Sequence, residues 1–109
     1  MRLLKGTLDI LVLKTLSWSA KHGVEIITWL EERSGGQLAV DDGALYQALH
    51  RLEERGMVAA DWGVTANNRR ARYYRLTATG RTYLRAESSS LMNYAQTLLT
   101  ILGSRPGHG

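Results

Sequence analysis

The 109-residue sequence contains no cysteine. This absence excludes disulfide frameworks, thiolate zinc sites and catalysis by a thiol. Only three histidines are present, and His108 lies in a short C-terminal tail, so no constellation of metal ligands can be assembled. We therefore expect neither a metal ion nor any other cofactor.

Long hydrophobic runs are also absent. The longest apolar segment covers residues 8–16 and is interrupted by Asp9, Lys14 and Thr15. A membrane-spanning helix needs about 20 predominantly apolar residues, and no signal-peptide layout is recognisable. The sequence predicts a soluble, cytoplasmic protein that makes no use of a membrane.

The motifs of common enzymes are missing as well. The chain has no nucleophile elbow, no HExxH motif and no glycine-rich phosphate loop. The serines at 88–90 have no histidine at a predictable distance. We expect no catalytic residues and no enzymatic activity.

Acidic residues are absent from residues 62–86. This stretch holds six arginines, while the rest of the chain holds eight basic and ten acidic residues, a net charge of −2. The formal charge of +4 therefore comes entirely from one segment. Any carboxylate partner must come from a distant part of the chain, and the phosphates of nucleic acid are the simplest source of negative charge. The arginines are Arg69, Arg70, Arg72, Arg75, Arg81 and Arg85.

The first third of the chain predicts two helices. Residues 7–16 are apolar almost all round, which indicates a buried helix with Thr7 as its N-cap. A second helix should run from about Lys21 to Arg33 and end at the glycines that follow. Residues 38–40 are long enough only for a short strand.

A third helix should begin at Asp41 or Asp42 and end before Gly56. Its inner face follows the i, i+3, i+4, i+7 pattern with Leu45, Ala48, Leu49 and Leu52. Its outer side carries Gly43, Gln47, His50 and Glu54, flanked by Tyr46 and Arg51. Most amphipathic helices of this length are scaffold elements, but these outer side chains can bond base edges or phosphates. We therefore interpret this segment as a recognition helix.

A hairpin should follow. Val58, Ala60 and Trp62 alternate as one strand, with Trp62 expected to face inward, and residues 72–76 alternate as the second strand. The segment 63–68 has the composition of a turn. An amphipathic helix beside an arginine-rich hairpin offers one element for the major groove and one for phosphates. The pattern predicts a mainly α fold with a small β-hairpin, the winged helix-turn-helix.

The last helix should be capped by Thr77 and end near Leu102, a length of about 35 Å. We expect residues 1–78 to form the DNA-binding domain, 79–102 a dimerisation helix and 103–109 a disordered tail. One domain of this size cannot cover the whole apolar stripe of this helix, which predicts a homodimer. The stripe consists of Leu84, Leu91, Tyr94, Leu98 and Ile101.

Four segments occur in order over residues 3–86: LLKGTLDILVLKTLS, HGVEI, GALYQALHRLEERGMV and NNRRARYYRLTATGRTYL. Together they resemble the PadR family of bacterial transcriptional regulators, in particular its short members. The resemblance implies a winged helix-turn-helix, a homodimer joined through terminal helices, and usually repression. It also implies that a small aromatic compound can act as an effector at the dimer interface. Val24 departs from the family, which usually has tyrosine there.

These observations predict a homodimeric, sequence-specific regulator, most simply a repressor, on an inverted-repeat operator in double-stranded DNA. The alternative is a winged-helix protein-interaction or adaptor module without specific DNA binding, which would not need an acid-free arginine hairpin. The residues expected to contact DNA are Lys21, His22, Gly43, Tyr46, Gln47, His50, Arg51, Asn67, Asn68, Arg69, Arg70 and Arg72.

Overall fold

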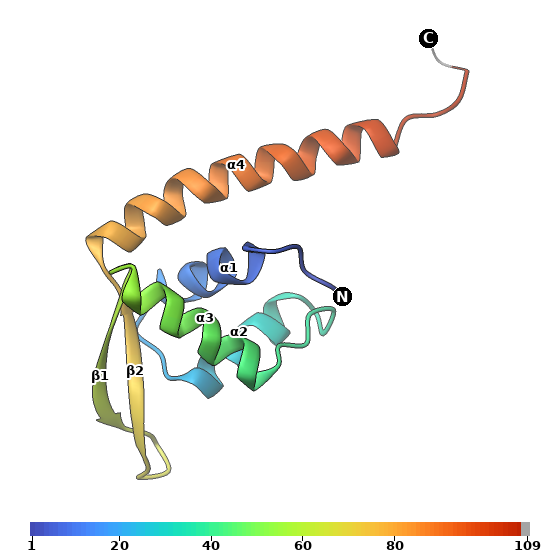
Figure 1. Cartoon of the computed structure of the whole chain (residues 1–109). Coiled ribbons are helices and arrows are strands. Elements are labelled where there is room, and N and C mark those ends of the chain that lie inside the picture. Colours follow the sequence, from blue (N-terminus) through green and yellow to red (C-terminus); the bar gives the residue numbers. More distant parts are fainter. Residues whose placement is uncertain (108–109) are drawn as a thin grey trace.

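Residues 1–107, the part of the chain that the computed structural model describes, form four helices and one antiparallel hairpin. The order is α1 (Thr7–Leu16), α2 (Gly23–Arg33), α3 (Asp42–Glu54), β1 (Val58–Val64), β2 (Arg70–Leu76) and α4 (Ala78–Leu102). The first three helices make a body from which the hairpin projects, while α4 runs past α1 and out beyond the body (Figure 1). This arrangement confirms the predicted winged helix-turn-helix with a long C-terminal helix.

The core lies where α1, α2 and α3 meet. Val12 and Leu13 of α1 and Ile26 of α2 are completely buried. The predicted inner face of α3 is confirmed, because none of its four apolar side chains is accessible to solvent. The helical period therefore fixes which side of α3 faces the core and leaves the opposite side at the surface.

Side chains cap two of the helices as predicted. Asp41 accepts a hydrogen bond of 3.1 Å from the first turn of α3, and Thr77 accepts one of 3.0 Å from the first turn of α4. The prediction for α1 was wrong, because Gly6 and not Thr7 is its N-cap. Gly6 has a left-handed φ of 86°, and no side-chain hydrogen bond caps this end. Glycine tolerates that conformation and turns the chain into the helix.

Three further expectations need correction. Helix α2 begins at Gly23 because Lys21 is extended and pairs with Tyr74 of β2, with backbone N–O distances of 3.0 and 2.9 Å. Residues 38–40 pair with no strand in the described chain. Trp62 does not face the core, because 61% of its surface is exposed.

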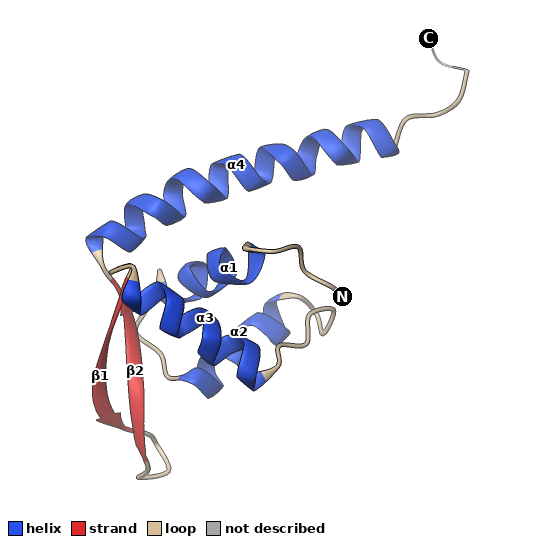
Figure 2. Ribbon diagram, viewed as in Figure 1, coloured by secondary structure: helices blue, strands red, loops and turns tan. Residues whose placement is uncertain are grey.

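Helix α4 begins at the base of the hairpin and runs above α1, whereas the hairpin points away in the other direction (Figure 2). At the start of α4, Gly80 lies against the backbone carbonyl of Met57, where no side chain would fit. One turn later Leu84 is only 8% exposed and belongs to the core of its own chain. Its assignment to a dimer interface was therefore wrong, and the unpartnered stripe begins further along α4.

The C-terminal part of α4 extends away from the body, and the molecule measures 61 × 28 × 21 Å. Residues 103–107 contain neither helix nor strand. The predicted disordered tail also includes His108 and Gly109, which lie outside the described residues. Among residues 1–107 no helix combines the length and hydrophobicity needed to cross a membrane.

Candidate nucleic-acid interface

The outer face of α3 is open to solvent. Gly43, Gln47 and His50 are exposed on it, as the helical period predicts. The His50 Nε2 atom lies 3.0 Å from a carboxylate oxygen of Glu54, one turn further along. Tyr46 turns toward α2, and its hydroxyl occupies the space that a side chain at Gly23 would need. The first turns of α3 therefore present small and polar groups beside the start of α2.

Arg51 is already engaged within the chain. Its Nη2 donates to Oδ1 of Asp9 at 2.7 Å and its Nε donates to Oδ2 at 3.3 Å. Asp9 is only 7% exposed, and its hydrogen bonds raise the pKa of Arg51. Although 52% of the Arg51 side chain remains exposed, its guanidinium fastens α3 to α1. The sequence did not indicate this structural role, and a contact of Arg51 with DNA stays a prediction.

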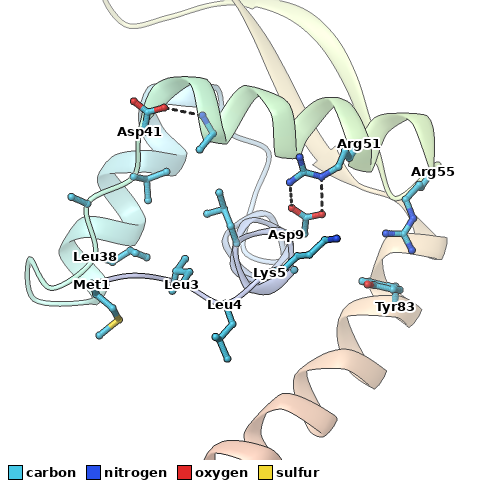
Figure 3. A pocket seen from close by; sticks show the side chains of 15 residues that line it. Met1, Leu3, Leu4, Lys5, Asp9, Leu38, Asp41, Arg51, Arg55 and Tyr83 are labelled. Carbon is cyan, nitrogen blue, oxygen red and sulfur yellow. Dashed lines mark hydrogen bonds and ion pairs between the residues drawn. The ribbon is translucent and has the colours of Figure 1, made fainter.

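A cavity of about 660 Å³ lies beside this ion pair, between the N-terminal segment, α1, α3 and α4 (Figure 3). Leucines of the N-terminal segment and Leu38 line its apolar side. Arg51 and Arg55 line the side toward α3, and the guanidinium of Arg55 lies 5.0 Å from the ring centre of Tyr83 on α4. Both the candidate recognition helix α3 and the C-terminal helix α4 therefore contribute to the wall of this cavity.

Lys21 is also turned inward. Its ammonium donates to the Thr15 carbonyl at the end of α1 (3.1 Å) and to the Ser19 hydroxyl (3.0 Å). Burial lowers the pKa of Lys21, and Glu25 opposes this change. Lys21 therefore holds the connection between α1 and α2, and its contact with DNA stays a prediction.

His22 lies at the start of α2, facing the hairpin. It is the N-cap of α2, and its backbone N–H donates to Glu25 at 3.1 Å. Its ring meets the ring of Tyr73 edge to face, with 5.3 Å between the centres. The N-terminus of α2, which carries partial positive charge, is thereby fixed next to β2.

One face of the hairpin carries alternating aromatic and cationic side chains, Tyr74, Arg72, Trp62 and Arg70, which we call the wing ladder. Trp62 pairs with Arg72 across the strands. The guanidinium of Arg70 lies 4.4 Å from the ring centre of Trp62, and that of Arg72 lies 5.8 Å from the ring centre of Tyr74. Such cation–π contacts hold flat groups in fixed relative positions.

The two arginines of the wing ladder have different partners. Arg72 donates two hydrogen bonds, of 2.9 and 3.4 Å, to the carboxylate of Glu53 in the last turn of α3. It therefore braces the hairpin against α3, and its contact with a phosphate stays a prediction. Arg75 similarly lies 3.5 Å from Asp61 on the neighbouring strand. For Arg69 and Arg70 no carboxylate lies within ion-pair distance in residues 1–107.

The hairpin tip is a tight turn at the surface. Thr65 and Arg69 close it with a backbone hydrogen bond of 2.8 Å, and Asn68 adopts a left-handed φ of 60°. Asn67, Asn68 and Arg69 are exposed there, as the sequence predicts.

A hollow of about 610 Å³, which we call the wing cleft, separates the hairpin from the start of α2 and from Tyr46. No carboxylate lines it. It brings together four predicted residues of the hairpin with His22 and Tyr46, whereas Gln47 and His50 lie next to it on α3. Its lining is His22, Gly23, Val24, Tyr46, Trp62, Thr65, Asn67, Arg69, Arg70, Ala71, Arg72 and Tyr74.

Sequence reasoning missed two residues that shape this surface: Trp62, which lines the wing cleft, and Glu53, which bonds Arg72 from α3. Strand alternation places Trp62 on the side of Tyr74, but a tryptophan at such a position predicts a core residue. The pairing of Glu53 with Arg72 joins residues 19 positions apart and depends on how the hairpin folds back on α3. No local pattern in the sequence carries that information.

The remaining predicted surface is the dimer interface, which the sequence places on the outer part of α4. Leu91 is half-buried, and Tyr94, Leu98 and Ile101 are exposed. Met92, Leu99 and Leu102 are also exposed there, so the apolar surface is wider than the predicted stripe.

The fold and sequence match those of known regulators. A family model described as the transcriptional regulator PadR-like family matches residues 12–86. A PadR-like transcriptional regulator from Bacillus cereus is similar with a TM-score of 0.80 and 22% identity, covering 94% of this chain and 97% of that chain. A PadR family transcriptional regulator from Eggerthella lenta has a TM-score of 0.76 and 25% identity, covering 93% and 86%.

A third similar structure is that of Bacillus subtilis PadR in complex with operator DNA. The TM-score is 0.65 with 20% identity, over 72% of this chain and 46% of that chain. The family match extends from the second half of α1 through α2, α3 and the hairpin to the first turns of α4. The chain therefore belongs to the PadR-like family of transcriptional regulators.

Proposed function

We propose that this chain regulates transcription by binding specific sequences in double-stranded DNA. The observation that carries the proposal is the position of the exposed face of α3 next to a cationic cleft without carboxylates. A helix fits the major groove, where each base pair presents a distinct pattern of donors and acceptors. The operator DNA bound to Bacillus subtilis PadR supports the same activity for this chain.

The side chains divide into three groups in this proposal. Gln47 and His50, with Gly43 allowing close approach, face the base edges. Arg69 and Arg70, together with the two asparagines of the tip and His22, bind phosphates and fix the position of the protein on the duplex. Arg51, Arg72 and Lys21 hold the elements in place, because each is bonded within the chain.

We further propose that two copies associate through the outer part of α4. Burying one leucine side chain contributes about 1.5–3 kcal/mol, so Leu91, Leu98 and their neighbours can supply a stable interface. A two-fold axis would present two α3 helices to successive major grooves, about 34 Å apart. The operator is then an inverted repeat. Occupation of a promoter by such a dimer would exclude RNA polymerase, so repression in the bacterial cytoplasm is the simplest mode of action.

The cavity beside the Asp9–Arg51 pair is the place where we propose that a small aromatic effector acts. Its apolar side suits a planar ring system, and an occupant would contact both α3 and α4. The aromatic probe anilinonaphthalene sulfonate should bind there and weaken DNA binding. Leu4→Trp, which places a larger side chain in the cavity, should reduce both effects, whereas unchanged probe binding would contradict this site.

Selection of duplexes from a random-sequence library tests the proposed function. The expected result is enrichment of an inverted repeat whose half-sites lie one helical turn apart. Fluorescence anisotropy should then show tighter binding to the selected duplex than to a shuffled sequence of equal length. Failure to enrich or bind any duplex would contradict the proposal and favour the adaptor alternative.

A further inference from the structure

Trp62 occupies an unusual position for a tryptophan. Single exposed apolar side chains are common and carry no information by themselves. This one, however, projects from the wing ladder into the wing cleft, with 61% of its surface open to solvent. Its surroundings therefore indicate what can cover it.

The indole is held in place before any partner arrives. Arg70 lies over its ring at 4.4 Å, and the strand register fixes it opposite Arg72. A side chain that is already ordered loses little conformational freedom on binding. Because Arg72 is taken by Glu53 whereas Arg70 has no carboxylate within ion-pair distance in the described chain, an anion bound by Arg70 would lie next to the indole.

The charge of the wing cleft identifies the occupant. Arginines and His22 line it, no carboxylate does, and Trp62 and Val24 add apolar surface. A chain that alternates anionic and apolar groups matches this lining, and one strand of DNA alternates phosphate with deoxyribose. A free anion would leave the indole uncovered, and an apolar peptide would leave the arginines unpaired.

We infer that Trp62 packs its indole against a deoxyribose of the DNA strand that passes through the wing cleft, while Arg70 binds the adjacent phosphate. The inference rests on the proposed DNA binding and adds a contact that salt does not screen. Trp62 thereby becomes a DNA-contacting residue beside the arginines.

The test compares Trp62→Ala with Trp18→Ala on the duplex selected from the random library. Trp18 is a matched control, because it is 64% exposed, has Arg33 at 5.9 Å from its ring centre, and lies outside the wing cleft. Trp62→Ala should weaken binding about tenfold, as expected for the loss of one aromatic contact per subunit, and leave the salt dependence unchanged. Trp18→Ala should bind like the wild type.

Shielding from the neutral quencher acrylamide provides a second readout. Bound duplex should protect part of the tryptophan emission in the wild type and in Trp18→Phe, but not in Trp62→Phe. Wild-type affinity in Trp62→Ala, or full protection in Trp62→Phe, would overturn the inference while DNA binding itself stands. A Trp62→Ala variant that flattens the salt dependence as much as Arg70→Ala would also overturn it, because Trp62 would then act only by placing Arg70. A wild-type protein that binds no duplex would instead contradict the proposed function.

Discussion

The wing cleft and the outer part of α4 are both exposed, but they differ in charge. The cleft combines arginines with ordered aromatic rings, and neighbouring side chains hold several of these groups in place. Residues 88–102 of α4 contain no charged side chain, and most of their apolar groups face solvent. The first surface suits a polyanion and the second suits another apolar surface. The difference supports the two proposed partners, DNA at the wing cleft and a second copy of the chain at α4.

The largest effect should come from placing charge on the apolar surface of α4. Replacing both Leu91 and Leu98 with aspartate puts unpaired charge into the proposed interface, which a buried site tolerates poorly. The variant should be monomeric by light scattering and bind the selected duplex about a thousandfold more weakly, because the two half-sites are no longer linked.

The same charges placed on the other side of α4, by Asn93→Asp and Gln96→Asp, form the matched control. This variant should remain dimeric and keep nearly wild-type affinity. If the variant with aspartate at Leu91 and Leu98 were still dimeric, the outer part of α4 would not be the dimer interface. The proposed difference in partner between α4 and the wing cleft would then fail.

A second prediction separates the two ends of α4. Leu84→Ala removes a core side chain and should lower the free energy of unfolding by about 3 kcal/mol at any protein concentration. Leu98→Ala should mainly weaken the dimer, so its effect on thermal unfolding should fade as the protein is diluted. Identical concentration dependence for the two variants would place Leu84 in the interface after all.

The third prediction concerns specificity on the DNA side. Gln47→Ala should reduce discrimination between the selected duplex and its single-base variants by about 1–3 kcal/mol, with little change in binding to shuffled DNA. His50→Ala should act at different base positions. Competition anisotropy measures both effects. If each variant retains the wild-type order of preference, α3 does not read the sequence.

The smallest effect should come from breaking the ion pair between Glu53 and Arg72. Exposed ion pairs contribute about 0–1 kcal/mol, so Glu53→Gln should change stability only slightly. The change removes a negative charge beside the wing and releases Arg72, so affinity for any duplex should rise about twofold at low salt. Weaker binding would show that the position of the hairpin, and not its charge, limits affinity.

Much of the fold could be predicted from the sequence because it depends on local periodicity. The four buried positions of α3, the caps at Asp41 and Thr77 and the turn before Arg69 follow from side-chain spacing and backbone preference. The dispositions of Leu84 and Trp62 could not be predicted in this way. Leu84 fits the heptad spacing but lies where α4 still packs on the body, and Trp62 alternates with core residues but extends past the end of the core.

In the candidate site, the partners of the charged side chains likewise could not be predicted from local sequence patterns. The sequence shows that residues 62–86 lack carboxylates, but not which distant carboxylates fold back onto them. Within this stretch, Arg72 donates hydrogen bonds to Glu53 of α3. Outside it, Asp9 accepts from Arg51, and a backbone carbonyl accepts from Lys21. Three of the predicted DNA contacts therefore also bond within the chain, and their contact with DNA, like that of Arg69 and Arg70, remains a prediction.

The salt dependence of duplex binding tests the central claim most directly. If each subunit of a dimer neutralises about three or four phosphates, a plot of log affinity against log salt concentration should have a slope of about −5 to −7. Arg70→Ala removes one contact per subunit and should bring this slope about two units closer to zero. A wild-type slope near zero, or an Arg70→Ala slope equal to that of the wild type, would contradict the assignment of the wing cleft to DNA.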